Sequence, residues 1–171
     1  DLDTAQTFTA GLTGTLTEVQ VFVKVEVGPS ATLDWDLRPL LTGGSPSNDD
    51  GSALASGTVT ITNTGYQFIS FDLTSFGFSI TSGDELAIVL STSTGQAAWG
   101  GTTGYADGAS FQRASVFTNF DWIVTQPDTD LGFKTFVEVS ETGGGEVPEP
   151  ATLALFGLGL AGMGWMRRRR R

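Results

Sequence analysis

The chain contains 171 residues, of which 9 are Lys or Arg and 19 are Asp or Glu, and it has no His and no Cys. A domain of this length can bury a core unaided, and the missing residue types exclude disulfides, thiolate metal sites, cysteine nucleophiles and imidazole catalysis. The formal net charge of -10 argues against nucleic acid binding, which needs a basic surface. We therefore expect a protein that is not an enzyme.

The charge is divided between an acidic body and a basic tail. Residues 1–146 hold 4 basic and 18 acidic residues, a net charge of -14, whereas residues 147–171 hold 5 Arg and 1 Glu, a net charge of +4. The chain begins at Asp1 without an initiator Met, as expected after removal of a signal peptide.

The body is predicted to consist of β-strands. Valines at every second position of residues 19–27, and apolar residues at every second position of 33–38, give a period of two. Further strands are predicted at residues 6–9, 58–62, 66–73, 85–91, 111–118 and 131–139, with Gly-, Ser-, Thr- and Asn-rich turns between them. This pattern predicts an all-β domain over residues 1–142, an antiparallel β-sandwich or jelly roll.

The same alternation predicts which side chains are buried. The expected core consists of Val21, Val23, Val25, Leu33, Trp35, Phe68, Phe71, Leu86, Ile88, Leu90, Val116, Phe133 and Val137. Three other aromatic residues, Trp99, Tyr105 and Trp122, lie in or beside Gly-rich or polar loops. They are candidates for an exposed platform that stacks against a carbohydrate, although loop aromatics can also fold back over the end of a sandwich.

Two acidic segments are weak candidates for a structural Ca²⁺ site, because Ca²⁺ binds converging oxygen ligands. The candidate ligands are Asp49, Asp50, Asp128 and Asp130. Neither segment has the spacing of an EF-hand loop, so the alternative is that these charges are only solvated. We expect no other cofactor.

The strand pattern ends after Val139. Residues 143–150 form a Gly-rich linker that ends in Pro148-Glu149-Pro150, and residues 151–166 contain no charge. Sixteen residues of helix span about 24 Å, somewhat less than the ~30 Å hydrocarbon core, and snorkelling arginines together with an interfacial Trp can supply the rest. We predict a single transmembrane helix over residues 151–171, anchored and oriented by Trp165, Arg167, Arg168, Arg169, Arg170 and Arg171.

The arginines should remain cytoplasmic, which places the body in the bacterial periplasm or at the cell surface. The alternative is a buried C-terminal helix with a solvated basic tip. Small residues recur on one face of the predicted helix, at Ala154, Gly157, Ala161 and Gly164. Such a face lets another transmembrane helix approach closely, although small residues can also merely fill an anchor.

The motif Pro148-Glu149-Pro150, the apolar run and the arginine cluster together closely resemble the PEP-CTERM sorting signal. The resemblance implies a secreted bacterial protein, usually Gram-negative, that is recognised at this motif by the membrane transpeptidase exosortase. It also implies a link to exopolysaccharide or biofilm matrix. The body loosely resembles the β-sandwich ectodomains of that family, a likeness that implies no activity.

Three functions remain open. We favour a non-catalytic, membrane-anchored structural protein that serves as an accessory subunit of a multi-subunit bacterial membrane complex, for example a respiratory or photosynthetic one. The first alternative is an exosortase-sorted surface or exopolysaccharide-matrix protein, and the second is a carbohydrate-binding module. The expected partners are the lipid bilayer, other transmembrane helices, exosortase and polysaccharide, without nucleic acid.

Overall fold

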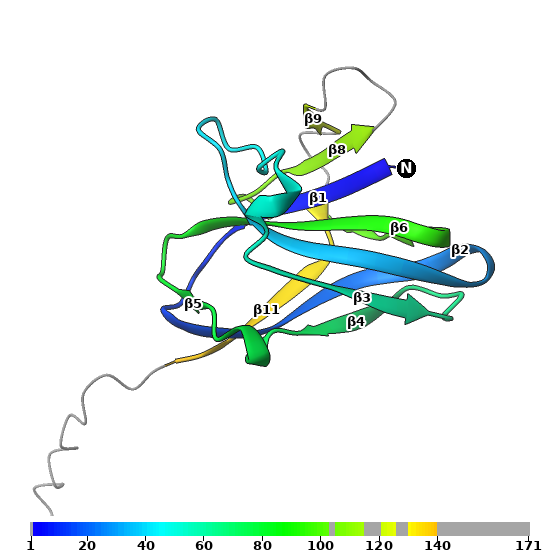
Figure 1. The fold of residues 1–171 in the computed structure, drawn as a ribbon, viewed down its shortest axis with the longest axis horizontal. Helices are drawn as coiled ribbons and strands as arrows, with labels where there is room; N and C mark the ends of the chain where they lie inside the picture. The colour runs from blue at the N-terminus through cyan, green and yellow to red at the C-terminus, as the bar shows by residue number, and fades with distance from the viewer. Residues whose placement is uncertain (1, 103–104, 115–120, 126–129, 140–171) are drawn as a thin grey trace, which may run out of the picture. The chain divides into compact units, whose positions relative to one another are not determined.

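The computed structural model describes residues 2–102, 105–114, 121–125 and 130–139 (Figure 1). The described strands are β1 (Leu2–Thr9), β2 (Gly14–Pro39), β3 (Ala55–Ile61), β4 (Gln67–Asp72), β5 (Ser79–Ile80), β6 (Glu85–Trp99), β7 (Gly101–Thr102), β8 (Ser110–Ala114), β9 (Ile123–Val124), β10 (Asp130–Leu131) and β11 (Phe133–Glu138). Two short 3-10 helices, η1 (Asp50–Ser52) and η2 (Thr74–Phe76), accompany them.

All pairings among these strands are antiparallel. The larger sheet has the order β11-β2-β6-β1-β8-β9, with β3, β4 and β5 also paired to β2, and β10 pairs with β7 separately. The prediction of an antiparallel all-β fold is therefore confirmed, and the finer assignment to a jelly roll remains a prediction.

Strand β2 is 26 residues long and joins the two strands predicted at 19–27 and 33–38. Its first half pairs with β4, β5 and β11, and its second half pairs with β3. The ladder with β6 is irregular between Val27 and Thr32. Within this stretch β2 has a positive φ at Gly28 (99°), and β6 has one at Gly95 (75°), which lies against Ser30 and Ala31. The paired strands change direction together here (Figure 1).

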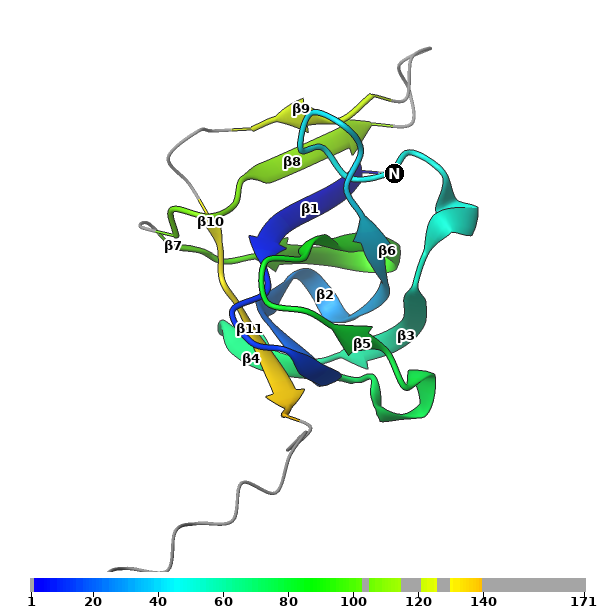
Figure 2. The same ribbon diagram turned by 90° about the vertical axis from the view of Figure 1, so that its left-hand side faces the viewer.

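The bend places the two halves of β2 on opposite sides of one core. Valines of the first half and Leu33, Trp35 and Leu37 of the second half belong to a single buried cluster. The Trp35 ring stacks on Phe71 of β4 at a centroid distance of 5.0 Å. Figure 2 shows β1 and β8 on one side of the molecule and β4 and β11 on the other.

Most of the predicted core is confirmed, with one error. The confirmed buried residues are Val21, Val23, Val25, Leu33, Trp35, Phe71, Leu86, Ile88 and Leu90. Phe133 and Val137 are half-buried, and Val116 lies outside the described residues. Phe68 is wrong, since it is 39% exposed: positions 68 and 71 are three apart in a strand with a period of two, so they face opposite sides.

Within the described ranges, the structure contains no helix that is both long and apolar enough to cross a membrane. The linker at residues 143–150 and the predicted transmembrane helix at 151–171 lie outside the described residues.

Candidate functional site

The three predicted platform rings are half-buried rather than exposed. The indole Nε1 of Trp99 donates to the carbonyl oxygen of Gly132 at 2.9 Å. The Tyr105 hydroxyl accepts a hydrogen bond from the Thr9 amide at 3.0 Å. Trp122 packs against a separate small cluster around Phe111. These contacts fix each ring within the fold, so they do not support a common platform made of these residues.

The candidate Ca²⁺ ligands are not brought together in the described part of the chain. Asp130 is buried and accepts hydrogen bonds from the Tyr105 amide at 2.8 Å and the Gln6 side chain at 3.4 Å. Asp49 accepts one from the Gly51 amide at 2.9 Å. The side chain of Asp50 and all of Asp128 lie outside the description, and the described residues contain no group of three or more potential metal ligands. The Ca²⁺ site remains a prediction.

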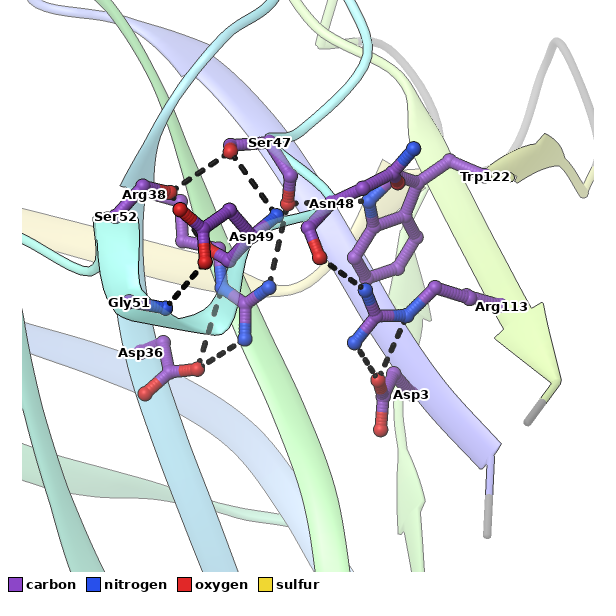
Figure 3. A network of polar contacts seen from close by, with 10 residues as sticks. All are labelled: Asp3, Asp36, Arg38, Ser47, Asn48, Asp49, Gly51, Ser52, Arg113 and Trp122. Carbon is purple, nitrogen blue, oxygen red and sulfur yellow. Dashed lines mark hydrogen bonds and ion pairs between the residues drawn. The ribbon is translucent and has the colours of Figure 1, made fainter. Parts of the chain in front are cut away.

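Two buried arginines hold the loop between β2 and β3 (Figure 3). Arg38 is 3% exposed, forms an ion pair with Asp36 and donates from Nη1 to the carbonyl oxygen of Ser47 at 3.2 Å. Arg113 of β8 is 7% exposed, forms an ion pair with Asp3 and donates from Nη1 to the carbonyl oxygen of Asn48 at 3.0 Å. The two guanidinium groups therefore hold consecutive carbonyls of one loop.

Further contacts strengthen the same network. The guanidinium carbon of Arg113 lies 4.9 Å from the centre of the Trp122 ring, and Trp122 Nε1 donates to the Ser47 carbonyl at 3.5 Å. Within the loop, the Ser52 hydroxyl donates to Ser47 Oγ at 2.7 Å. Among the described residues of this network, no buried side-chain polar atom lacks a hydrogen-bond partner, so we interpret the network as structural.

A different surface carries exposed aromatic rings. It is the outward side of β4, the first half of β2 and β11, and we call it the outer face. Its defining residues are Glu18, Gln20, Phe22 and Lys24 of β2, Phe68, Ser70 and Asp72 of β4, Tyr66 directly before β4, and Lys134 and Phe136 of β11. Phe22 pairs with Phe68 across the strands, Gln20 with Ser70, and Glu18 with Asp72. A pair of aromatic rings, a pair of an amide and a hydroxyl, and a pair of carboxylates thus follow one another along the sheet.

The rings of the outer face touch each other and two lysines. The Phe22 ring lies 5.3 Å from Tyr66 in a stacked arrangement and 5.0 Å from Phe68, tilted by 39°. Lys24 Nζ lies 4.9 Å from the centre of the Tyr66 ring, and Lys134 Nζ lies 3.9 Å from that of Phe68. Tyr66 is 43% exposed, so the cluster is open to solvent.

A shallow groove of about 460 Å³ continues the outer face, lined by Thr17, Glu18, Ser70, Asp72 and Thr74. Hydrogen bonds from the Ser70 hydroxyl and then the Gln20 amide hold the pKa of Glu18 below its ordinary value. The side-chain hydroxyl of Thr74, followed by its backbone amide, lowers the pKa of Asp72 in the same way. Both groove carboxylates are consequently ionised at neutral pH and accept hydrogen bonds.

Sequence reasoning missed the outer face, although one signal was present. Between the valines of 19–27, most alternate positions are polar, yet Phe22 occupies one of them. A large aromatic residue on the polar side of a strand indicates an exposed ring. The register between β2 and β4 is needed to place Phe68 beside Phe22, and the sequence alone does not give this register.

Comparison with protein families decides the nature of the tail. Residues 146–171 match the family model described as the PEP-CTERM protein-sorting motif. The chain carries a PEP-CTERM sorting signal. The match includes Pro148, Glu149 and Pro150 together with the apolar run and the arginines, which confirms the resemblance.

The PEP-CTERM signal implies export, membrane anchoring of the C-terminal signal and exosortase as the processing enzyme. Comparisons with characterised proteins and with solved structures returned no match.

Proposed function

We propose that this chain is an exosortase-sorted surface or matrix protein whose β-rich body acts outside the cytoplasm without catalysis. The observation that carries the proposal is the PEP-CTERM match at residues 146–171. The match favours a sorted surface or matrix protein over an accessory subunit of a membrane complex. The sequence analysis favours the subunit, but neither the comparisons nor the described residues provide support for it.

The order of the parts explains how sorting would proceed. An uncharged run at 151–166 would hold the exported chain in the inner membrane, and Arg167–Arg171 would keep the C-terminal end in the cytoplasm. Pro148-Glu149-Pro150 then lies on the body's side of the anchor. A segment with two prolines resists helix formation, so it offers exosortase an extended peptide next to the membrane.

The carboxylates of the outer face are poor candidates for general acids. Glu18 and Asp72 are direct cross-strand neighbours. A carboxylic acid that donates a proton at neutral pH needs a raised pKa, whereas hydrogen bonds lower the pKa of both groups. The pair is suited to accepting hydrogen bonds and not to general acid catalysis.

Replacement of the motif tests the proposal. We would express the chain in its native host with Pro148, Glu149 and Pro150 changed to Ala, and follow it by fractionation into inner membrane, periplasm and cell surface. The proposal expects wild-type protein at the surface without peptides from residues 151–171, and the variant in the inner membrane with them. A matched control changes Glu141 and Thr142, which precede the matched residues, to Ala. Surface delivery of the triple variant would contradict the proposal.

A further inference from the structure

The outer face presents a set of rings that the fold does not need for its core. Tyr66 and Phe68 are 43% and 39% exposed, while the inward side chains of the same strands, such as Val21 and Phe71, already belong to the buried core. Contiguous exposed apolar groups commonly mark a binding site. Aromatic side chains are effective there because they lose little conformational entropy when they bind.

The backbone beneath Phe22 keeps this ring cluster in place. A Cβ atom at Gly100 would lie 2.7 Å from Cδ1 of Phe22 and 2.9 Å from Cδ1 of Tyr66, and one at Gly132 would lie 2.9 Å from Cβ of Phe22. Glycine at both positions therefore lets the Phe22 and Tyr66 rings lie close to the backbone. This close packing against the backbone restricts the positions that the Phe22 and Tyr66 rings can take.

Polar groups continue from the rings along the same strands. Gln20 donates to Glu18 at 2.7 Å and contacts the Ser70 hydroxyl at 3.3 Å. The Asp72 carboxylate accepts a hydrogen bond from Thr74 Oγ1 at 2.6 Å. From position 18 to position 24 the face extends about 20 Å, at 3.3–3.4 Å per residue. A ligand along it would meet apolar rings first and then a row of donors and acceptors.

Charge limits which ligand fits. Residues 1–146 carry a net charge of -14, so the body as a whole repels anionic polymers. The body's arginines, Arg38 and Arg113, are buried, and the two lysines both lie on the outer face, where Glu18 and Asp72 balance them. The face is locally close to neutral, which favours an uncharged ligand rich in hydroxyl groups.

The charges at the ring cluster disfavour a protein partner. A standard protein interface covers about 800 Å² on each side and has an apolar centre depleted in charge. Here charged groups lie over the rings, with Lys134 Nζ 3.9 Å from the centre of the Phe68 ring and Lys24 Nζ 4.9 Å from that of Tyr66. Rings flanked by hydroxyl-binding groups instead match a sugar, whose C–H face is apolar and whose rim carries hydroxyls.

We propose that the outer face binds a neutral polysaccharide. Binding displaces the ammonium groups of Lys24 and Lys134 from over the Tyr66 and Phe68 rings. Sugar rings then stack on these two rings and against Phe22. Their hydroxyls bond to Gln20, Ser70, Glu18 and Asp72. The proposal rests on the proposed function, because sorting brings the body to the place where extracellular polysaccharide lies. It assigns carbohydrate binding to residues other than Trp99, Tyr105 and Trp122.

Affinity electrophoresis of the purified full chain in mild detergent tests the proposal. Gels would contain hydroxyethylcellulose, galactomannan, glucomannan or dextran as neutral polymers, and carboxymethylcellulose as an anionic polymer with the backbone of the first. We expect retardation by at least one neutral polymer and weaker retardation by carboxymethylcellulose. Tyr66→Ala and Phe68→Ala should each raise the apparent Kd about tenfold, and Glu18→Gln and Asp72→Asn should raise it less.

Phe76→Ala is the matched control, because Phe76 is 44% exposed and its ring packs on Trp35 in a T-shaped arrangement, outside the ring cluster. It should bind as the wild type does, and thermal melting would establish that every variant is folded. Absence of retardation by all neutral polymers, stronger retardation by carboxymethylcellulose, or equal effects of Phe76→Ala and Phe68→Ala would overturn the proposal. Binding by the purified chain does not depend on exosortase, so its failure is distinguishable from a failure of sorting.

Discussion

Trp35 and Phe71 lie almost parallel, with their ring planes inclined by 7° and their centroids 5.0 Å apart. The two residues come from the second half of β2 and from β4, so their contact joins the two sides of the core. Gly57 of β3 permits this position, since a Cβ there would lie 2.8 Å from Cζ2 of Trp35. The Trp35 ring therefore lies between the Gly57 backbone and the Phe71 ring.

Replacement of Phe71 by Ala should strongly destabilise the body. Phe71 is 2% exposed, and loss of such a ring costs about 3–5 kcal/mol through lost burial and a residual cavity. Urea denaturation of both proteins would measure the change in free energy of unfolding. Phe136→Ala serves as the control, since Phe136 is 41% exposed and should change stability by less than about 1 kcal/mol. Similar losses in the two variants would show that the stack is not central.

The bend at Gly95 should not tolerate a side chain. Gly95 has a φ of 75°, and a Cβ would lie 2.4 Å from the Ser30 carbonyl oxygen. Left-handed strain and overpacking together predict a loss of about 2–5 kcal/mol for Gly95→Ala. Gly83→Ala isolates the strain, because Gly83 has a φ of 97° and nothing within 4 Å of a Cβ, and should cost about 1–2 kcal/mol. Equal melting temperatures of the two variants would contradict the tight bend.

Removal of Arg113 should loosen the loop between β2 and β3. The change Arg113→Met deprives the Asp3 carboxylate and the Asn48 carbonyl of a donor, and breaking a buried ion pair costs about 3–5 kcal/mol. Hydrogen exchange of the amides near Ser47 should accelerate. Arg113→Lys keeps the charge but lacks the planar fork of donors, so its effect should be intermediate. Unchanged hydrogen exchange in Arg113→Met would show that Arg113 does not hold the loop in place.

The lowered pKa of Glu18 should make stability depend on pH. The carboxylate is stabilised mainly by the Ser70 hydroxyl and the Gln20 amide. A carboxylate whose folded pKa is depressed stabilises the fold above its unfolded pKa, and this contribution is lost as pH falls through the folded pKa. The melting-temperature difference between wild type and Glu18→Gln should thus be present at about pH 7 and vanish by about pH 2, a range that spans ordinary carboxylate titration. Ser70→Ala should shrink the difference, and a difference that grew in acid would contradict the assignment.

The sequence predicted features that depend on residues close together in the chain, namely strand periodicity and the sorting signal. The valines of residues 19–27 indicated a strand with one buried face, because a half-buried strand requires a period of two. Pro148-Glu149-Pro150 with its apolar run is a linear signal, and the family match confirms it without any knowledge of the fold.

Features that depend on distant partners could not be predicted in this way. Arg38 and Arg113 look like surface charges in the sequence, yet Ser47 and Asn48 accept hydrogen bonds from them inside the protein. Gly95 carries no signal of its own in the sequence for a shared bend, and its approach to Ser30 shows that β6 and β2 bend together. The polar loops around Trp99 and Tyr105 left open whether these rings form an exposed platform or fold back, and their hydrogen bonds with Gly132 and Thr9 show that they pack into the fold.

The central claim, sorting by exosortase, is tested most directly by the intact mass of the protein isolated from the surface of its native host. The account predicts a mature chain that ends at or near Pro148-Glu149-Pro150 and lacks the apolar run and Arg167–Arg171. A surface protein whose mass still includes Arg171 would contradict it.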